Sequence, residues 1–197
     1  MLDIFRGKNY SRAIHSAIVY LIDFRVEDQK DVHIMANLIT TKRLEMRRFR
    51  QADKEEYVKI ITNPAVYKYL GDGKGVDRKF VEKMLTFYSF SLGIFAVVEK
   101  ESGKLIGHCG IRPIQDGRIE LLYAYDPSVW GKGYGTEAAK AVLEYGKEHF
   151  EIDELIGMAY PENPGSIGIL KKLGFKSIGE EEHFGNTLEV FELEMGK

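Results

Sequence analysis

The stretch that decides the fold runs from Tyr123 to Ala138 and reads Tyr-Ala-Tyr-Asp-Pro-Ser-Val-Trp-Gly-Lys-Gly-Tyr-Gly-Thr-Glu-Ala. Its apolar start predicts a strand that ends at Asp126, and a strongly helical run begins at Thr136. Glycines occupy three alternate positions between them, and glycine lets a backbone curl closely around a ligand. Because the first N–H groups of a helix lack intrahelical partners and lie at the positive end of its dipole, this turn predicts an anion site. A pyrophosphate is the anion that we expect it to hold.

Two familiar phosphate-binding motifs do not fit the turn. A Walker A loop is excluded because its Gly-Lys-Ser/Thr ending is absent. A dinucleotide fingerprint is excluded because the preceding strand belongs to a meander and does not open a βαβ unit. A plain connection from strand to helix stays open as the alternative for this stretch alone.

On the N-terminal side of the turn, short apolar runs indicate an antiparallel meander. We expect strands at 93–99, 104–113 and 118–125, because Glu-Ser-Gly and Gln-Asp-Gly turns separate them. Earlier in the chain, alternation of apolar and charged residues predicts a first strand at 42–49.

Two helices are predicted between the first strand and the meander. Asp53 caps the first helix with Glu56 three residues later, which is a capping-box spacing, and Asn63-Pro64 ends it. The second helix, at 77–89, has apolar side chains at helical spacing that we expect to face the core. They are Phe80, Met84, Leu85 and Tyr88.

The C-terminal side continues the alternation of helix and strand. A helix is predicted at 136–149, a strand at 154–160, and a short helix at 166–173 that a glycine ends. A closing hairpin pairs 175–179 with 188–195. The element order β-α-α-β-β-β-α-β-α-β-β predicts an α/β fold, with helices on both faces of a mixed sheet.

Composition sets broad limits on function. With 197 residues, 44% hydrophobic and 29% charged, the chain suits one globular domain. A net charge of −2 gives no basic field for nucleic acid. The single Cys109 excludes an internal disulfide and a multi-thiolate site, so we expect no metal and a cytoplasmic setting. The longest apolar run, at 13–26, is too short and too charged for a membrane span, so no membrane contact is expected.

Two segments are expected along the chain, an N-terminal extension at 1–40 and a domain at 41–197. The extension is either an amphipathic element packed on the domain or an upstream addition before a natural start at Met35. The break in composition leaves both alternatives open. The extension could also provide the interface of a homodimer.

Four stretches resemble one known family. Trp-Gly-Lys-Gly-Tyr-Gly-Thr-Glu-Ala at 130–138 resembles the pyrophosphate loop of the GNAT superfamily of acetyl-CoA-dependent N-acetyltransferases. Thr-Lys-Arg-Leu-Glu-Met-Arg-Arg-Phe at 41–49 resembles the opening strand of the subfamily that includes the ribosomal-protein N-terminal acetyltransferases. Residues 119–125 resemble its central strand, and 163–175 its later Asn-to-Gly-Phe motif. Together the resemblance covers 41–195.

The resemblance implies a fold, a co-substrate and the residues that hold it. The fold is a GNAT-like, mostly antiparallel sheet that splays between its fourth and fifth strands. Acetyl-CoA would enter the gap, and the backbone of Tyr123, Ala124 and Tyr125 would pair with its pantetheine arm like an added strand. Its pyrophosphate would lie on the N–H groups of the turn, where a side chain at position 133 would intrude. These groups belong to Gly131, Lys132, Gly133, Tyr134, Gly135 and Thr136.

The later motif and two departures complete the implied site. Asn163 would bond the pantetheine amides, and Ser166 would lie near the thioester sulfur or the diphosphate. Trp130 stands where many family members have Arg or Gln, and we expect it to pack rather than bind. Leu170 stands where many have a tyrosine as general acid, and a leucine cannot protonate a thiolate. That role passes to Ser166, to a water, or to no group.

Acetyl transfer needs a neutral amine, a carbonyl polarised by a donor such as a strand N–H, and a tolerable leaving thiolate. The family match makes Glu120 the candidate base, and a solvent-facing strand residue paired to Lys or Arg is the alternative. His108 could face the same cleft, although a lone strand histidine is more often structural, and Cys109 should point to the opposite face. The acidic run at 180–182 before His183 either lines a channel for a cationic acceptor or is a solvated turn.

The predicted function is direct transfer of an acetyl group from acetyl-CoA to a primary amine. The subfamily resemblance suggests a protein N-terminal α-amino group as the acceptor. One alternative is that the acceptor is a small amine (polyamine, amino sugar, antibiotic). A second is a catalytically weak acyl-CoA-binding regulatory module, which stays open because Leu170 cannot act as a general acid. A third is an unrelated phosphate- or nucleotide-binding protein.

Overall fold

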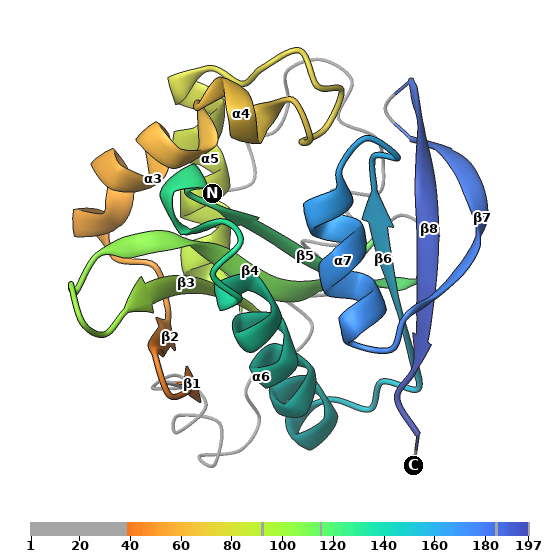
Figure 1. Ribbon diagram of the computed structural model, residues 1–197. Coiled ribbons are helices and arrows are strands. Elements are labelled where there is room, and N and C mark those ends of the chain that lie inside the picture. The colour runs from red at the N-terminus through yellow and green to blue at the C-terminus, as the bar shows by residue number, and fades with distance from the viewer. Residues whose placement is uncertain (1–38, 92, 115, 184, 197) are drawn as a thin grey trace.

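The strands pair into one eight-stranded mixed sheet with helices against both faces (Figure 1), which confirms the expected α/β class. The structure, a computed structural model, describes residues 39–196 apart from 92, 115 and 184. Its strands are β1 (Ile39–Thr40), β2 (Leu44–Arg47), β3 (Ile94–Glu99), β4 (Leu105–Pro113), β5 (Ile119–Tyr125), β6 (Glu154–Ala159), β7 (Lys176–His183) and β8 (Asn186–Glu194). Its helices are α3 (Lys54–Ile61), α4 (Pro64–Tyr67), α5 (Arg78–Phe90), α6 (Tyr134–His149) and α7 (Pro164–Lys172), with 3-10 turns η2 (Gln51–Asp53) and η3 (Pro127–Val129).

The sheet opens in its middle, between β5 and β6. The strand order is β1-β2-β3-β4-β5-β6-β8-β7, and neighbouring strands are antiparallel except for β5 and β6. These two run parallel and pair only through Glu120 and Ile156. The splay that the resemblance implied is therefore confirmed. The gap follows the fourth predicted strand, which becomes β5 because the short β1 adds one strand to the count.

Alternation along the strands gives the sheet two apolar faces, each covered by its own helices. One face packs against α6 and α7 around Leu155 and Phe191, both at most 1% exposed. The other face packs against α3, α4 and α5 around Tyr57 and Val81, both fully buried. The glycine turn at the start of α6 thus belongs to the first face, and α3 and α5 form the wall of the second.

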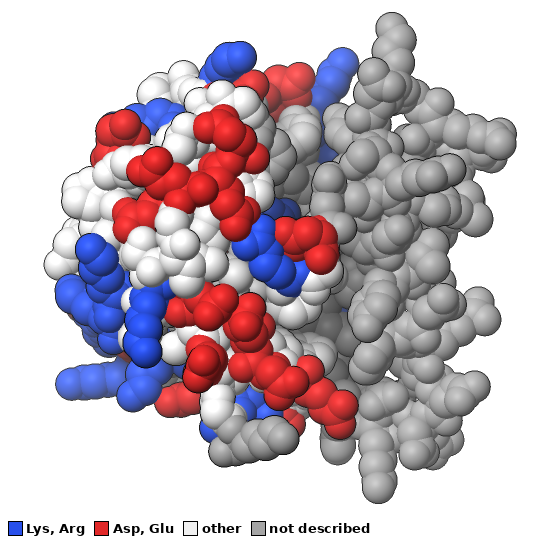
Figure 2. All heavy atoms as spheres, turned by 90° about the vertical axis from the view of Figure 1, so that its right-hand side faces the viewer, with Lys and Arg blue, Asp and Glu red and all other residues white. Residues whose placement is uncertain are grey.

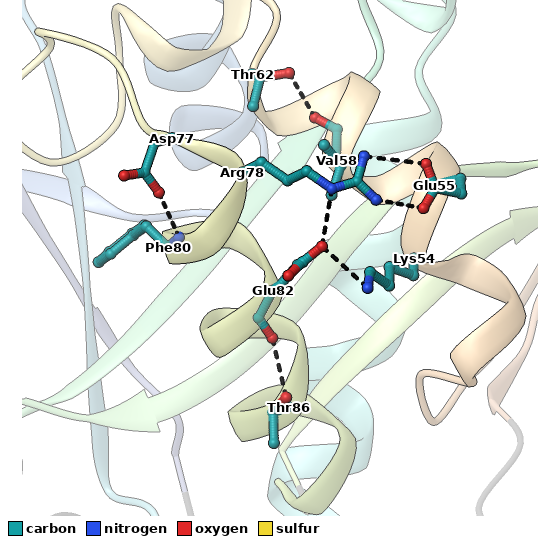
Figure 3. A network of polar contacts seen from close by, with 9 residues as sticks. All are labelled: Lys54, Glu55, Val58, Thr62, Asp77, Arg78, Phe80, Glu82 and Thr86. Atoms are coloured by element: carbon teal, nitrogen blue, oxygen red, sulfur yellow. Dashed lines mark hydrogen bonds and ion pairs between the residues drawn. The ribbon is translucent and has the colours of Figure 1, made fainter. Parts of the chain in front are cut away.

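Charged side chains tie α3 to α5 at the surface (Figure 3). Arg78 contacts Glu55 through both terminal nitrogens and reaches Glu82 with its Nε at 2.9 Å. Lys54 contacts the same Glu82 carboxylate at 3.0 Å. The Arg78 guanidinium lowers the pKa of Glu55. Because exposed ion pairs contribute little to stability, the apolar residues beneath this network hold the two helices in place.

The predicted capping box at Asp53 is wrong. Its carboxylate accepts from both terminal nitrogens of Arg47, at 2.7 and 2.8 Å, and from the backbone N–H of Arg50 at 2.7 Å. Asp53 is only 7% exposed, and no side chain caps α3. Because two guanidinium bonds and the Arg50 N–H already occupy the carboxylate, Asp53 joins β2 to η2, and Glu56 has no capping role.

Three further details of the helices differ from the prediction. Asn63 does end α3, but its side chain also accepts from the N–H of Ala65 at 3.0 Å and begins α4, with Pro64 at the first helical position. In α5 the buried face includes Val81, whereas Phe80 is 41% exposed. The helix expected from 136 begins two residues earlier, at Tyr134.

The first described residues already belong to the sheet. Ile39 and Thr40 pair with Met46 and Glu45, so the sheet begins before the expected domain start at 41. The predictions for 1–34, including a natural start at Met35, lie outside the described residues. Within the described part of the chain, no helix is long and apolar enough to cross a membrane.

Candidate active site

The three glycines of the turn are needed for two different reasons. Gly131 and Gly133 adopt positive φ angles of 74° and 81°, in the left-handed region that favours glycine. Gly133 is the N-cap of α6. Gly135 lies inside the helix, and a Cβ there would come within 2.6 Å of Ile169 Cδ1, so glycine lets α7 approach α6.

The backbone N–H groups of the turn are available to a ligand. The first bond of α6 runs from the N–H of Glu137 to the carbonyl of Gly133 at 3.1 Å. Between Gly131 and Thr136, no N–H donates to any other described residue. A series of free donors at a helix N-terminus fits a pyrophosphate, as the sequence predicted.

Arg43, in the bend just before β2, contacts this turn and holds it in place, a role that sequence reasoning missed. Its Nε donates to Glu137 Oε2 at 2.6 Å, and its Nη1 donates to the carbonyl of Lys132 at 2.9 Å. The guanidinium carbon lies 4.1 Å from the centroid of the Tyr134 ring. Thr41 also donates to Glu137, at 2.5 Å. These contacts fix the conformation in which the N–H groups of the turn are presented.

Glycine at position 133 is required by its backbone conformation alone. Among the protein atoms, a Cβ at Gly133 would have Arg43 Nη2 as its nearest neighbour, at the ordinary contact distance of 3.5 Å. The positive φ angle therefore favours glycine even without a ligand, and intrusion of a side chain on the pyrophosphate stays a prediction.

Backbone groups of β5 face the gap at alternate residues. The N–H of Asp126 donates to the carbonyl of Ile106 at 2.8 Å. Counting back from Asp126, every second residue, including Ala124, therefore directs its backbone N–H and C=O groups toward β4. Tyr123 and Tyr125 then direct their N–H and C=O groups toward β6. The indole of Trp130 donates to the carbonyl of Tyr125 at 2.9 Å, while Trp130 stays 45% exposed. Of the three residues predicted to bind pantetheine, Tyr123 thus presents both backbone groups to the gap.

The start of α7 lies across the gap from β5. Asn163 is its N-cap, and the side-chain oxygen accepts from the N–H of Ser166 at 3.1 Å, which leaves the amide nitrogen as a donor. The Tyr123 hydroxyl lies 3.0 Å from Ser166 Oγ and 3.2 Å from the Ser166 carbonyl oxygen. Leu170, one turn later, is 1% exposed and packs so closely on β6 that a Cβ at Gly157 would lie 2.4 Å from its Cδ2.

Glu120 lies on the opposite face of the sheet, at the pair where β5 and β6 meet. It is 8% exposed, and its carboxylate accepts from Arg112 Nε at 2.8 Å. Arg112 is its direct partner across the β4–β5 ladder. Glu120 is thus ion-paired but buried beside the gap, and not solvent-facing as the alternative had it, so its role as a base stays a prediction.

His108 and Cys109 point to opposite faces, as their alternation predicts. His108 is 3% exposed and its Nδ1 lies 3.1 Å from the Tyr57 hydroxyl. Burial lowers the pKa of His108 to about 3, so the ring is neutral and a poor base. Burial also raises the pKa of Cys109 to about 12, which makes the thiol unreactive.

The acidic run at 180–182 belongs to a strand, β7, and not to a turn. The Glu181 carboxylate accepts from Arg118 at 2.8 and 2.7 Å and contacts His183 at 2.9 Å. Arg118, with a smaller effect of His183, lowers the pKa of Glu181 to about 2. Among the described residues, no three His, Cys, Asp or Glu side chains gather in an arrangement that could hold a metal ion.

Comparisons with known sequences agree with this geometry. Residues 43–176 match the model of the acetyltransferase (GNAT) domain. An uncharacterized N-acetyltransferase of Bacillus licheniformis, p20, is 28% identical over 77% of this chain and 91% of its own length. Another from Bacillus subtilis (strain 168), YnaD, is 30% identical over 72% of this chain and 84% of its own.

Solved structures share the fold at low identity. A GNAT-family acetyltransferase from Bacillus anthracis superposes with a TM-score of 0.71 at 22% identity, covering 81% of this chain and 99% of that one. Spermidine N-acetyltransferase from Vibrio cholerae, in complex with CoA and spermine, gives 0.66 at 17%, covering 79% and 97%. A ribosomal alpha-N-protein acetyltransferase in complex with coenzyme A gives 0.66 at 13%, covering 80% and 98%. The chain belongs to the GNAT family of acetyltransferases, which transfer an acetyl group from acetyl-CoA to an amine.

Proposed function

We propose that the acceptor is the α-amino group at the N-terminus of a protein or peptide, and that Glu120 receives its proton. One observation carries this proposal: the buried carboxylate of Glu120 belongs to the residue pair through which β5 joins β6, next to the gap between the two strands. Its bond to Arg112 fixes the orientation of the carboxylate while one oxygen, Oε1, takes no part in that bond.

The acidity of the acceptor decides which amine such a site can use. A carboxylate is a weak base, so it accepts a proton only as the amine attacks. Deprotonating an α-amino group with a pKa of about 8 at pH 7 costs about 1.4 kcal/mol. Deprotonating a lysine with a pKa of about 10.4 costs about 4.6 kcal/mol. The site therefore favours α-amino groups over lysine side chains.

The donor would be held from the other face of the sheet. Free N–H groups between Gly131 and Thr136 would bind the pyrophosphate, and the Asn163 amide and the Tyr123 backbone would bind the pantetheine arm. Acetyl-CoA supplies an activated acetyl group. A backbone N–H of Tyr123 facing the gap would polarise its carbonyl oxygen.

A small polycation is the second candidate acceptor, and one surface favours it. Figure 2 shows acidic side chains gathered on the side of the molecule that β7 and β8 form. The two strands contribute Glu180, Glu181, Glu182, Glu189, Glu192 and Glu194. The relatives in structure support both candidates, since one acts on spermidine and another on a ribosomal protein.

An acceptor panel tests the proposal. Thiol release from acetyl-CoA would be followed with three acceptors: a lysine-free peptide with a free N-terminus, the same sequence blocked at its N-terminus and carrying one lysine, and spermidine. We expect the first to give the highest kcat/KM, and Glu120→Gln to lower kcat most strongly at low pH. Preferred turnover of the blocked lysine peptide or of spermidine would contradict the α-amino proposal.

A further inference from the structure

We propose that Tyr123 is a positioning residue for the departing thiolate: its hydroxyl holds Ser166 so that the Ser166 O–H donates to the sulfur. This inference rests on the proposed function, because it assumes acetyl transfer in the gap between β5 and β6. Tyr123 then acts through its side chain as well as through its backbone.

The Tyr123 side chain crosses from β5 to the first turn of α7. Its hydroxyl lies 3.0 Å from Ser166 Oγ and 3.2 Å from the Ser166 carbonyl oxygen. The Ser166 carbonyl can only accept, whereas between the two hydroxyls either oxygen could be the donor. We take Tyr123 as the donor to Ser166 Oγ, because a phenol is far more acidic than an aliphatic alcohol. In that arrangement the Ser166 hydrogen stays free to point elsewhere.

Neighbouring groups are unable to supply a proton at this place. Leu170, one helical turn beyond Ser166 on the same side of α7, is apolar and fully packed against β6. Cys109, opposite Tyr123 on β4, is completely buried with its pKa raised to about 12. The Tyr125 hydroxyl is buried in the same core as the Cys109 thiol, and burial raises its pKa well above the usual value. Tyr123 and Ser166 are thus the hydroxyl pair that joins β5 to α7.

The reaction step balances without a stored proton on the enzyme. The amine nitrogen forms a bond to the carbonyl carbon, and the C–S bond breaks with its electron pair on sulfur. The Ser166 O–H donates a hydrogen bond to that thiolate, which then takes its proton from water. The nitrogen loses one proton to Glu120, which returns it to solvent.

Burial fits a donor that never ionises. It raises the pKa of Tyr123 well above the ordinary value near 10, with a smaller opposing effect from the Ser166 hydroxyl. Tyr123 therefore stays protonated throughout the range in which an acetyltransferase would be assayed. The bond to Ser166 keeps one direction, and the orientation of Ser166 does not change with pH.

The test compares hydroxyl deletions in the full-length protein. We expect Tyr123→Phe and Ser166→Ala each to lower kcat by about 10- to 100-fold, with KM for acetyl-CoA within about threefold of wild type. Because Tyr123 acts through Ser166, the double variant should be no slower than Ser166→Ala alone. Tyr57→Phe is the matched control, since it deletes a buried hydroxyl with one bond, 3.1 Å to His108, on the opposite face of the sheet. Its kcat should match wild type.

A donor with a better leaving group distinguishes stabilisation of the thiolate by Ser166 from a purely structural role of the Tyr123 and Ser166 hydroxyls. With an acetyl selenoester analogue of acetyl-CoA, whose selenolate needs less stabilisation, the deficit of both variants should shrink to about threefold or less. An equal deficit with both donors would overturn the inference, as would an unchanged kcat in folded Ser166→Ala. A wild-type protein that turns over no amine would instead refute the proposed function, and this inference with it.

Discussion

Replacing Gly133 by valine should abolish tight binding of acetyl-CoA in a protein that still folds. Gly133 has a φ angle of 81°, which costs an L-residue about 1–2 kcal/mol and a β-branched one more. The backbone would relax toward negative φ and turn the N–H groups of Gly133 and Tyr134 away from the pyrophosphate. Each charge-assisted bond contributes about 1.5–3 kcal/mol, so losing two should weaken binding by about two to four orders of magnitude.

Gly103→Val provides the matched control for backbone strain. Gly103 lies in the turn between β3 and β4 with a φ angle of 66°, and nothing lies within 4 Å of the Cβ it would gain. Both variants should lower Tm by about 2–8 °C. Calorimetric titration with acetyl-CoA should show lost affinity in Gly133→Val alone. Unchanged affinity in a folded Gly133→Val protein would refute the assignment of this turn to the pyrophosphate.

Three further outcomes follow from the buried polar groups. Between pH values of about 6.5 and 3, His108 binds a proton in the unfolded chain but stays neutral in the folded protein. The free energy of unfolding should therefore fall by up to about 1.4 kcal/mol per pH unit as the pH is lowered through this range. Urea unfolding at several pH values should show a shallower slope for His108→Gln. Arg112→Met removes the 2.8 Å partner of Glu120 and should lower the free energy of unfolding by about 1–3 kcal/mol in the same assay, because the Glu120 side chain, 10% exposed, is left buried without that partner. Cys109 should react with a thiol reagent only after unfolding, and rapid labelling of the native protein would contradict its burial.

Much of the fold follows from local patterns in the sequence. The meander strands were predicted from apolar runs and turn residues, and each lies within one residue of its expected bounds. The Gln-Asp-Gly turn also fixes the cross-strand partner of Glu120, because a hairpin centred on 116 places Arg112 opposite it. The ion pair of the candidate base could therefore have been found from the sequence.

Other parts of the site depend on contacts that no local pattern encodes. Arg43 contacts Lys132 and Glu137, which follow it by 89 and 94 residues in the sequence, and nothing in the residues around Arg43 indicates these partners. The failed capping box at Asp53 has the same cause, because Arg47 on β2 competes for the carboxylate. The Tyr123–Ser166 contact likewise appears only when α7 packs across the gap. Local propensity predicts elements, and long-range charged and polar partners decide what their side chains do.

The one-residue pairing of β5 with β6 gives two strands in the middle of the sheet the behaviour of strands at its rim. Amide hydrogens that point into the gap, such as that of Tyr123, should exchange with deuterium about as readily as those of an outer strand. Their counterparts that point toward β4 should be protected by the ladder. A ligand arm that fills the gap as an added strand would slow exchange there selectively. Isotope exchange followed residue by residue would thus report how far the arm reaches along β5, with no turnover required.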